Sequence, residues 1–243
     1  MGLFITGTDT GVGKTVVTAA LAAALRRRNL CVGVMKPVET GCIRKEGRLV
    51  PRDALRLLEA SGSTASLDLV NPYALAQPLA PALAAEVEGV RINPDRIRSC
   101  YRQLAAEHDV VLVEGAGGLM VPITDQGARK GHPYTMLDLA ADLRLPLLVV
   151  ARNILGVINH TALTVAVARQ RSLAVLGVVL NHPSPEGDPA TKTNAGSLRR
   201  WSGTKVLAEI PFVQSLDGDM LRSLGEHLEI DRLLEAMLHV RNL

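Results

Sequence analysis

The segment FITGTDTGVGKTVV, residues 4–17, combines a glycine-rich loop with Gly-Lys-Thr at the start of a helical pattern. Gly7 and Gly13 enclose five residues, one more than the usual phosphate-binding pattern has between its first glycine and Gly-Lys. Backbone N–H groups of such a loop, together with the following helix N-terminus, attract phosphate. We expect Lys14 to contact the β- and γ-phosphates of a nucleotide and the Thr15 hydroxyl to ligate Mg²⁺. A ligand-free glycine-rich turn is the alternative, which Gly-Lys-Thr after a strand disfavours.

Two carboxylates are candidates to complete a magnesium site. In VVLVEGAGG, residues 110–118, Glu114 stands at the end of an apolar run and precedes a glycine loop. Gly117 and Gly118 allow backbone to approach a ligand closely, which favours a ligand role over a helix cap or a solvated loop residue. Asp53 opens the helical pattern DALRLLEA and, considered alone, is better interpreted as a helix N-cap.

A second lysine follows another predicted strand. In MKPVETG, residues 35–41, Lys36 lies at the carboxyl end of the strand and Pro37 ends regular pairing. If it faces the same crevice as Lys14, a second anion is expected beside the nucleotide phosphates. A surface lysine with its stem on apolar neighbours is the alternative, and the segment alone does not decide between them.

The elements that must position these residues alternate along the chain. Short apolar runs predict strands at residues 2–6, 31–35, 110–114, 145–151, 173–181 and 205–211. Helical patterns occupy residues 14–28, 53–60, 94–108, 156–171 and 219–238, the last with a candidate break near Gly225. Segments 41–52, 124–134 and 182–196 are rich in Gly, Pro and charge and are expected to be loops.

This alternation predicts an α/β fold: a doubly wound, mostly parallel sheet flanked by helices, as in P-loop nucleotide-binding proteins. The nearly continuous apolar runs are typical of strands that are buried on both faces. No change of composition divides the chain, so we expect one domain over residues 1–243. In such folds ligands bind outside the carboxyl ends of the strands, where Lys36 and Glu114 are predicted.

Composition restricts the function further. The net charge of +3 comes from 27 basic and 24 acidic residues spread along the chain, and aromatic residues make up only 2%. Neither a basic surface nor a stacking platform for nucleic acid is therefore expected. No apolar run approaches the roughly 20 residues of a membrane span. Cys31, Cys42 and Cys100 show no CxxC spacing, so we expect a reducing, cytoplasmic location.

Six motifs occur in the order found in the dethiobiotin synthetase family: GTDTGVGKT, KPVETG, the Asp of RDAL, NPY, VEGAGG and GVINH. The resemblance covers roughly residues 3–181, and EIPF at 209–212 is a further match. The family's phosphate loop has the same five-residue interval, which accounts for the unusual length noted above. Each motif is weak alone, but six in order are specific.

The resemblance implies an ATP-dependent ligase. Dethiobiotin synthetases combine 7,8-diaminononanoate, CO₂ (or bicarbonate as its source) and Mg-ATP into dethiobiotin, ADP and phosphate. One amine takes up CO₂ as a carbamate, ATP phosphorylates the carbamate oxygen, and the second amine closes a cyclic urea. Such chemistry needs positioning and charge stabilisation rather than a protein nucleophile, and no Ser-His-Asp or Cys-His pattern is evident in the chain.

The resemblance also implies residue roles, most of them around the nucleotide. The phosphates would be held by Thr10, Gly11, Val12, Gly13, Lys14 and Thr15. Mg²⁺ would be surrounded by Thr15, Asp53 and Glu114, and Lys36 would offset the charge of the carbamate and the transferred phosphoryl group. Asn181 and Pro211 would contact the adenine. The glycine loop would contact nucleotide, carbamate and diamine through Gly115, Ala116, Gly117 and Gly118.

The family works as a homodimer with its substrate across the interface. Thr40 would contact the diamine, and Asn159 of GVINH begins the helix whose N-terminus would face the carboxylate of the partner's substrate. LMVPI, residues 119–123, could line the groove for the apolar chain of that substrate.

The chain departs from the family pattern in three places. Gly11 stands where some members have Glu, and His182 follows Asn181 where Asp is frequent, which leaves base selectivity open. The segments 125–134 and 183–196 are longer than in some members, and we interpret them as surface insertions rather than lids.

Two other functions remain as alternatives. A cobyrinate-type amidotransferase would need a glutaminase domain, for which this chain has no room. A switch ATPase of the cell-division or partition type would carry an extra lysine where this chain has Asp9.

Overall fold

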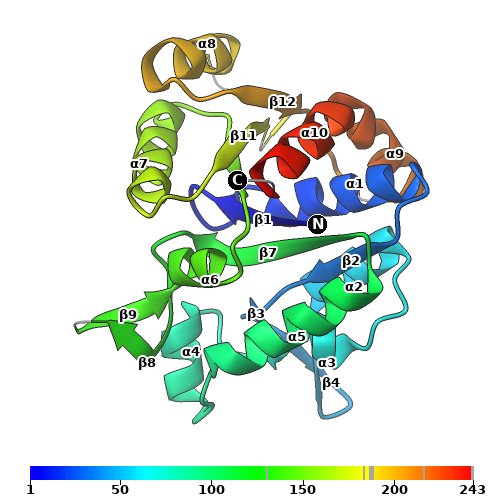
Figure 1. Ribbon diagram of the computed structural model, residues 1–243, viewed down its shortest axis with the longest axis vertical. Coiled ribbons are helices and arrows are strands. Elements are labelled where there is room, and N and C mark those ends of the chain that lie inside the picture. Colours follow the sequence, from blue (N-terminus) through cyan, green and yellow to red (C-terminus); the bar gives the residue numbers. More distant parts are fainter. Residues whose placement is uncertain (130, 183, 186–188, 216, 242–243) are drawn as a thin grey trace.

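A six-stranded parallel sheet forms the centre of the molecule (Figure 1). The computed structural model describes residues 1–129, 131–182, 184–185, 189–215 and 217–241. The strand order is β12-β11-β10-β1-β7-β2. The strands are β1 (Gly2–Gly7), β2 (Val32–Met35), β7 (Val110–Gly118), β10 (Leu147–Arg152), β11 (Val175–Asn181) and β12 (Val206–Ile210). This arrangement confirms the predicted fold class.

Helices flank the sheet. The longer ones are α1 (Lys14–Arg26), α2 (Arg52–Ser61), α5 (Pro94–Glu107), α7 (Val157–Gln170), α9 (Gly218–His227) and α10 (Ile230–Arg241). Helix α1 packs on β1 and β7 and is itself contacted by α2 and α9, whereas α5 contacts β2 and β7 and α7 contacts β10 and β11. Shorter helical segments are α3 (Leu67–Val70), α4 (Pro81–Val87), α6 (Met136–Asp142), α8 (Thr191–Ser197) and the π-helical turn η1 (Leu198–Ser202). The indole of Trp201 in η1 is exposed.

The core is aliphatic, as the composition predicts. Side chains of β1 such as Leu3, Phe4 and Ile5 are fully buried, and so are Val111 and Leu112 of β7. A strand with both faces buried is covered by helices on each side, which explains why its sequence is continuously apolar rather than alternating.

Two segments that we expected to be loops contain hairpins. Residues 41–52 include β4 (Ile43–Lys45) and β5 (Arg48–Val50), joined at Glu46 and Gly47, which both have positive φ. Two such residues form the tight turn whose twist suits a hairpin, so polar composition alone misled the prediction. Residues 124–129 lie in β8 (Pro122–Arg129) and residues 132–134 in β9 (His132–Thr135). Residue 130 of this segment, and residues 183 and 186–188 of the third predicted loop, lie outside the described residues.

One predicted boundary was wrong. Strand β7 does not end at Glu114 but continues to Gly118, because the glycines let the chain pair closely with Gly7 of β1 despite a shift of register. The last helical segment breaks near Gly225, as expected: α9 ends at His227 and α10 begins at Ile230. A Cβ on Gly225 would lie 3.0 Å from the Cβ of Ala24, so this glycine permits α9 to pack on α1.

The carboxyl ends of the strands form the rim where the predicted site residues meet. Figure 1 shows α6, α7 and the β8–β9 hairpin on the same side of the molecule as the loop that follows β1. A further two-stranded pair, β3 (Val38–Glu39) and β6 (Tyr73–Ala74), follows β2 at this rim. No helix in the described part of the chain is long and apolar enough to cross a membrane.

Candidate active site

The loop between β1 and α1 has the form of a phosphate loop. Gly11 and Gly13 adopt positive φ angles of 71° and 99°, and Gly13 is the N-cap of α1. Lys14, the first residue of the helix, is buried, and its Nζ donates to the backbone oxygen of Asp9 at 3.0 Å. The lysine therefore folds back over the loop, where bound phosphates would meet it.

Glycine is needed in this loop for space as well as for backbone angle. A Cβ on Gly7 would lie 2.6 Å from the Asp9 backbone oxygen and 2.9 Å from the Lys14 Nζ. A Cβ on Gly13 would lie 2.2 Å from Nδ2 of Asn181. Any side chain at either position would displace the loop or its supports.

Lys36 lies between two carboxylates. Its Nζ forms an ion pair with Glu114 Oε1 and another with Asp53 Oδ2, the latter at 3.1 Å. The Thr15 hydroxyl donates to Glu114 Oε1 at 2.9 Å. Glu114 is fully buried, and its Oε2 has no hydrogen-bond partner among the described residues. The structure thus brings together four residues that the sequence analysis singled out from four separate segments.

The two lysines share one electrostatic environment. Burial, followed by the nearby charge of Lys36, lowers the pKa of Lys14 to about 8. Burial alone would also lower the pKa of Lys36, but the Glu114 and Asp53 carboxylates hold it above its ordinary value. Lys36 therefore stays protonated, whereas the protonated form of Lys14 would be stabilised by an anionic ligand.

Asp53 is not the N-cap that its sequence context favoured. Pro51 is the N-cap of α2, and the carboxylate of Asp53 contacts Lys36 instead. The cap is supplied by Glu39, whose two oxygens accept from the backbone N–H groups of Asp53 and Ala54, each at 3.0 Å. Burial raises the pKa of the Glu39 carboxyl, although these two N–H groups oppose the shift. Sequence reasoning missed Glu39; its only signal was a carboxylate within the motif KPVETG.

The NPY motif supports the backbone of Lys36. The Lys36 N–H donates to the Val70 oxygen at 2.8 Å, and Asn71 Nδ2 donates to the Lys36 oxygen at 2.7 Å. Both backbone groups of Lys36 are therefore held by the end of α3, which lies far from Lys36 in the sequence. This fixes the point from which the lysine side chain extends.

The glycine segment that follows Glu114 lies against the phosphate loop. Gly118 pairs in register with Gly7, and a Cβ on it would lie 3.2 Å from the Gly7 oxygen. Gly117 has φ +64°, and its missing Cβ would lie 3.4 Å from Thr10 Oγ1. Gly115 lies against the ring of Phe4, with Ala116 beside it partly buried.

The remaining predicted residues are spread along the rim. Asn181 ends β11 and donates from Nδ2 to the Val12 oxygen at 3.0 Å, so it contacts the loop directly. Thr40 follows β3 and is partly buried, while Pro211 follows β12 and is exposed. Asn159 is exposed in the first turn of α7. Within the described residues, neither Pro211 nor Asn159 forms a hydrogen bond with the phosphate loop.

An apolar groove adjoins the loop. A cavity of about 410 Å³ is lined by Leu119, Met120, Val121 and Pro122 together with Leu163 and Val167 of α7 and residues 8–10 of the loop. Met120 and Leu163 are 61% and 58% exposed, and Leu155 just before α7 is 80% exposed. Apolar side chains are therefore exposed both in this groove and just before α7.

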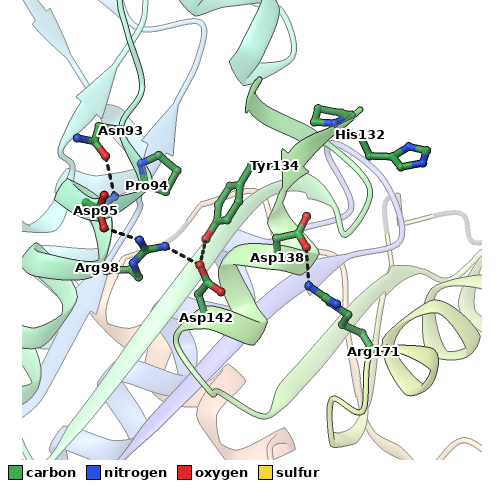
Figure 2. A pocket seen from close by; sticks show the side chains of 10 residues that line it. Asn93, Pro94, Asp95, Arg98, His132, Tyr134, Asp138, Asp142 and Arg171 are labelled. Atoms are coloured by element: carbon green, nitrogen blue, oxygen red, sulfur yellow. Dashed lines mark hydrogen bonds and ion pairs between the residues drawn. The ribbon is translucent and has the colours of Figure 1, made fainter. Parts of the chain in front are cut away.

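A larger cavity of about 860 Å³ lies between the start of α5, strand β9 and α6 (Figure 2). Its charges are paired with each other. Arg98 bridges Asp95 and Asp142, and the Tyr134 hydroxyl donates to the same Asp142 at 2.8 Å. Asp138 pairs with Arg171 at 3.0 Å. These contacts join α5 to α6 and leave little unsatisfied charge for a ligand.

The described residues contain no cluster of three or more His, Cys, Asp or Glu side chains placed to hold a metal ion by themselves. A hydroxyl and two carboxylates near one another are nevertheless the oxygen donors that Mg²⁺ uses when substrate phosphates complete its shell. Thr15, Asp53 and Glu114 provide that set.

The parallel sheet, the loop and its buried lysine define an α/β P-loop nucleotide-binding protein. A family model described as an AAA domain matches residues 1–219. Solved structures agree on the fold. The MinD protein of Pyrococcus horikoshii complexed with Mg-ADP superposes with a TM-score of 0.55 at 16% identity, covering 97% of this chain and 96% of that chain. The MinC:MinD complex of Aquifex aeolicus gives 0.53 at 17%, covering 97% and 95%.

Curated sequences identify the family. An ATP-dependent dethiobiotin synthetase of Anaeromyxobacter dehalogenans (strain 2CP-C) is 49% identical over 227 residues, 93% of this chain and 96% of the relative. Those of Thermodesulfovibrio yellowstonii and Bacillus cereus (strain B4264) are 39% and 38% identical, covering 96% and 99% of this chain and 98% and 96% of their own lengths. The chain belongs to the family of ATP-dependent dethiobiotin synthetases, ligases of biotin biosynthesis, as its motifs predicted. Its likeness to cell-division ATPases is one of fold.

Proposed function

We propose that the chain carboxylates 7,8-diaminononanoate with CO₂, phosphorylates the resulting carbamate with ATP, and closes the cyclic urea of dethiobiotin. The observation that carries this assignment is the pair of buried lysines in one crevice. Lys14 lies on the phosphate loop, and Lys36 lies beside Glu114 and Asp53. Two anions can be stabilised there, the triphosphate and the carbamate.

The residues act by placing charge. An amine of the substrate attacks CO₂ and loses a proton, giving a carbamate whose oxygen then attacks the γ-phosphorus of ATP as ADP departs. Lys14 and the loop amides bind the phosphates, and Lys36 faces the carbamate and the transferred phosphoryl group. The second amine attacks the carbonyl carbon and expels phosphate, which completes the ring.

We also propose Mg²⁺ as the cofactor, held by Thr15, Asp53 and Glu114. The unpartnered Oε2 of buried Glu114 supports this, because a buried carboxylate oxygen without a donor is costly unless a ligand satisfies it. The ion would neutralise negative charge on the nucleotide phosphates. The protein's part is to hold the oxygens: Glu39 fixes the turn that carries Asp53, and β7 fixes Glu114.

The apolar groove suits the hydrocarbon chain of the substrate. Thr40 and Gly118 would contact the diamine end, and the chain would run along Leu119 and Val121. The exposed Leu155, Met120 and Leu163 support a homodimer that covers them. The N-terminus of α7, with Asn159, would then receive the carboxylate of the partner's substrate.

Asn181 and Pro211 are proposed to contact the adenine. Asn181 uses Nδ2 on the loop, so its Oδ1 is the atom for the exocyclic amine of the base. Next to Asn181, His182 forms a hydrogen bond through its Nε2 with Asn153 Nδ2, at 3.2 Å.

We also propose that the protein is cytoplasmic and that residues 1–243 form one domain.

The test is product formation by the purified chain. Supplied with 7,8-diaminononanoate, ¹³C-bicarbonate, Mg²⁺ and ATP, it is expected to form dethiobiotin with the label in the urea carbon, together with one ADP and one phosphate per product. Omitting the diamine should stop ADP release. ATP hydrolysis that is indifferent to diamine would favour the switch-ATPase alternative instead. GTP and CTP in place of ATP measure the base selectivity.

Mixed variants test the shared site. Lys36→Ala and Asn159→Asp should each be inactive alone, but an equimolar mixture should recover about a quarter of wild-type activity, because half of the dimers are mixed and carry one intact site. Absence of recovery from a chain shown to exchange subunits would contradict the placement of α7 at the partner's site.

A further inference from the structure

Arg152 is the last residue of β10, and it pairs in register with Asn181, the last residue of β11. Neither the motifs nor the resemblance singled it out. Both residues lie where their strands reach the rim, and both side chains contact the phosphate loop from the β10 and β11 side of the sheet. Arg152 is partly buried at this position.

The contacts of these two side chains fall on successive carbonyl groups. Arg152 Nη2 donates to the Gly11 oxygen at 3.3 Å and approaches the Thr10 oxygen at 3.5 Å. Asn181 Nδ2 donates to the Val12 oxygen at 3.0 Å. Three consecutive carbonyls of the loop are therefore held from one side.

Because the peptide group is planar, fixing these carbonyl oxygens also fixes the direction of the amide N–H groups that follow them. In a planar trans peptide, the C=O of one residue and the N–H of the next point in opposite directions. Holding the oxygens of Thr10, Gly11 and Val12 toward Arg152 and Asn181 therefore turns the N–H groups of Gly11, Val12 and Gly13 the other way. That is the direction needed for these amides to form an anion-binding concavity.

The guanidinium of Arg152 has a hydrogen-bond donor and a positive charge that its loop contacts do not use. Arg152 forms no ion pair within the described part of the chain, and its buried Nε has no hydrogen-bond partner there. The missing Cβ of Gly11 would lie 3.3 Å from Arg152 Nη2, so the guanidinium occupies the space that a side chain at position 11 would use. An unpaired cation thus lies directly behind a loop that binds polyanions.

We propose that Arg152 is a positioning residue for the nucleotide: it fixes the phosphate loop through the Thr10 and Gly11 carbonyls and adds positive charge behind it. This rests on the proposed role of the loop in binding ATP. Arg152 acts through the loop, so its contribution falls on nucleotide affinity rather than on the reacting carbamate.

Calorimetric titration of Mg-ADP into the full chain tests this without product formation. Arg152→Ala is expected to weaken Mg-ADP binding by about 10- to 100-fold, the range for a charge-assisted hydrogen bond. The KM for ATP should rise by a similar factor, while kcat and the KM for the diamine stay within about threefold of wild type. Arg152→Lys, which keeps the charge but not the guanidinium Nη2 contacts with the two carbonyls, should be intermediate. Arg102→Ala, an exposed arginine of α5, is the matched control and should bind as wild type.

Three outcomes would overturn the proposal. These are wild-type Mg-ADP affinity in Arg152→Ala, equal losses in the Lys and Ala variants, or an equal loss in Arg102→Ala. If Arg152→Ala fails to fold, the comparison between Arg152→Lys and wild type decides, since an unchanged affinity there would contradict a role for the Nη2 contacts with the loop carbonyls. Wild-type protein that binds Mg-ADP with the expected Arg152 dependence but forms no dethiobiotin would refute the proposed function alone.

Discussion

The crevice at the phosphate loop and the cavity of Figure 2 hold similar numbers of charged side chains, but the two regions differ in whether these charges have partners. In the cavity, Arg98 forms ion pairs with two carboxylates, and one of them, Asp142, also accepts a hydrogen bond from the Tyr134 hydroxyl. Asp138 pairs with Arg171. In the crevice, Lys14 has only a backbone oxygen, and one oxygen of Glu114 has no partner among the described residues.

Cavity size therefore does not identify the functional region of this molecule. The larger cavity is lined by a network of ion pairs that links α5 to α6, and its charged side chains are paired with one another. The crevice is incomplete without a ligand. The pKa of Lys14 is lowered there because the nearby carboxylates do not offset its burial and the charge of Lys36. Buried charge that lacks partners is the better indicator of a site here, and each prediction below tests that contrast.

The largest effect is expected for Lys14→Ala. Removing a buried cation from the phosphate loop should lower kcat/KM for ATP by about 10³-fold, or about 4 kcal/mol. Steady-state kinetics measure it, with circular dichroism to confirm folding. Near-normal turnover would exclude Lys14 from phosphate binding and would remove the main difference between the two regions.

Lys36→Ala should suppress dethiobiotin formation by about 10²- to 10³-fold while Mg-ADP affinity changes little, since Lys36 faces the carbamate side. The change also leaves Glu114 without its ion pair, so Lys36→Arg serves as a control that keeps the charge. Calorimetry and product assays on the same samples separate the two effects. Unchanged turnover would take Lys36 out of the mechanism.

Glu114→Gln should raise the Mg²⁺ concentration needed for half-maximal activity by about 10- to 100-fold, because a buried anionic oxygen is replaced by a neutral amide. Asp53→Asn should act in the same direction with a smaller effect, since Asp53 is more exposed. Activity as a function of free Mg²⁺ measures both. If neither variant alters the metal requirement, the proposed oxygen set is wrong.

The lowered pKa of Lys14 predicts a pH effect. Its ammonium must be charged to attract phosphate, so kcat/KM for ATP should be flat below pH 8 and fall by up to tenfold per pH unit above it. The corresponding fall in kcat should lie at higher pH, because bound phosphates favour the charged form. Lys14→Arg, which stays protonated, should abolish the decline. A decline that persists in this variant would assign it to another group.

The smallest kinetic effect is expected in the cavity. Tyr134→Phe removes the hydrogen bond to Asp142 and should lower the free energy of unfolding by about 1 kcal/mol while kcat and both KM values stay unchanged. Urea denaturation and steady-state kinetics measure the two quantities. A clear loss of activity at unchanged stability would mean that the cavity takes part in function after all.

The sequence predicted the parallel sheet because its strands are buried on both faces and read as apolar runs. It predicted Lys14 from the Gly-Lys-Thr pattern after a glycine-rich loop, and Lys36 and Glu114 because each stands at the end of such a run. It did not predict the β4–β5 hairpin, whose pairing depends on two positive φ angles at Glu46 and Gly47 rather than on hydrophobic pattern. It also ended β7 early, since glycines are poor indicators of a strand that continues by close backbone pairing.

The supports of the site were harder to predict than the site itself. Glu39 caps a helix that begins after a hairpin, and Asn71 holds a lysine 35 positions earlier. Arg152 contacts a loop 141 positions away. Such contacts depend on how strands and loops come together at the rim, and no local spacing encodes them. The single domain over residues 1–243 stays a prediction.

The exposed Trp201 of η1 is the single tryptophan of the chain. It lies at the amino end of β12, whereas the proposed adenine contact at Pro211 follows the carboxyl end of the same strand. Its fluorescence emission should therefore resemble that of indole in water and should not change when the crevice fills. A blue shift on adding Mg-ADP would instead reveal that the edge of the sheet rearranges with nucleotide, giving an optical signal from a part of the molecule remote from the chemistry.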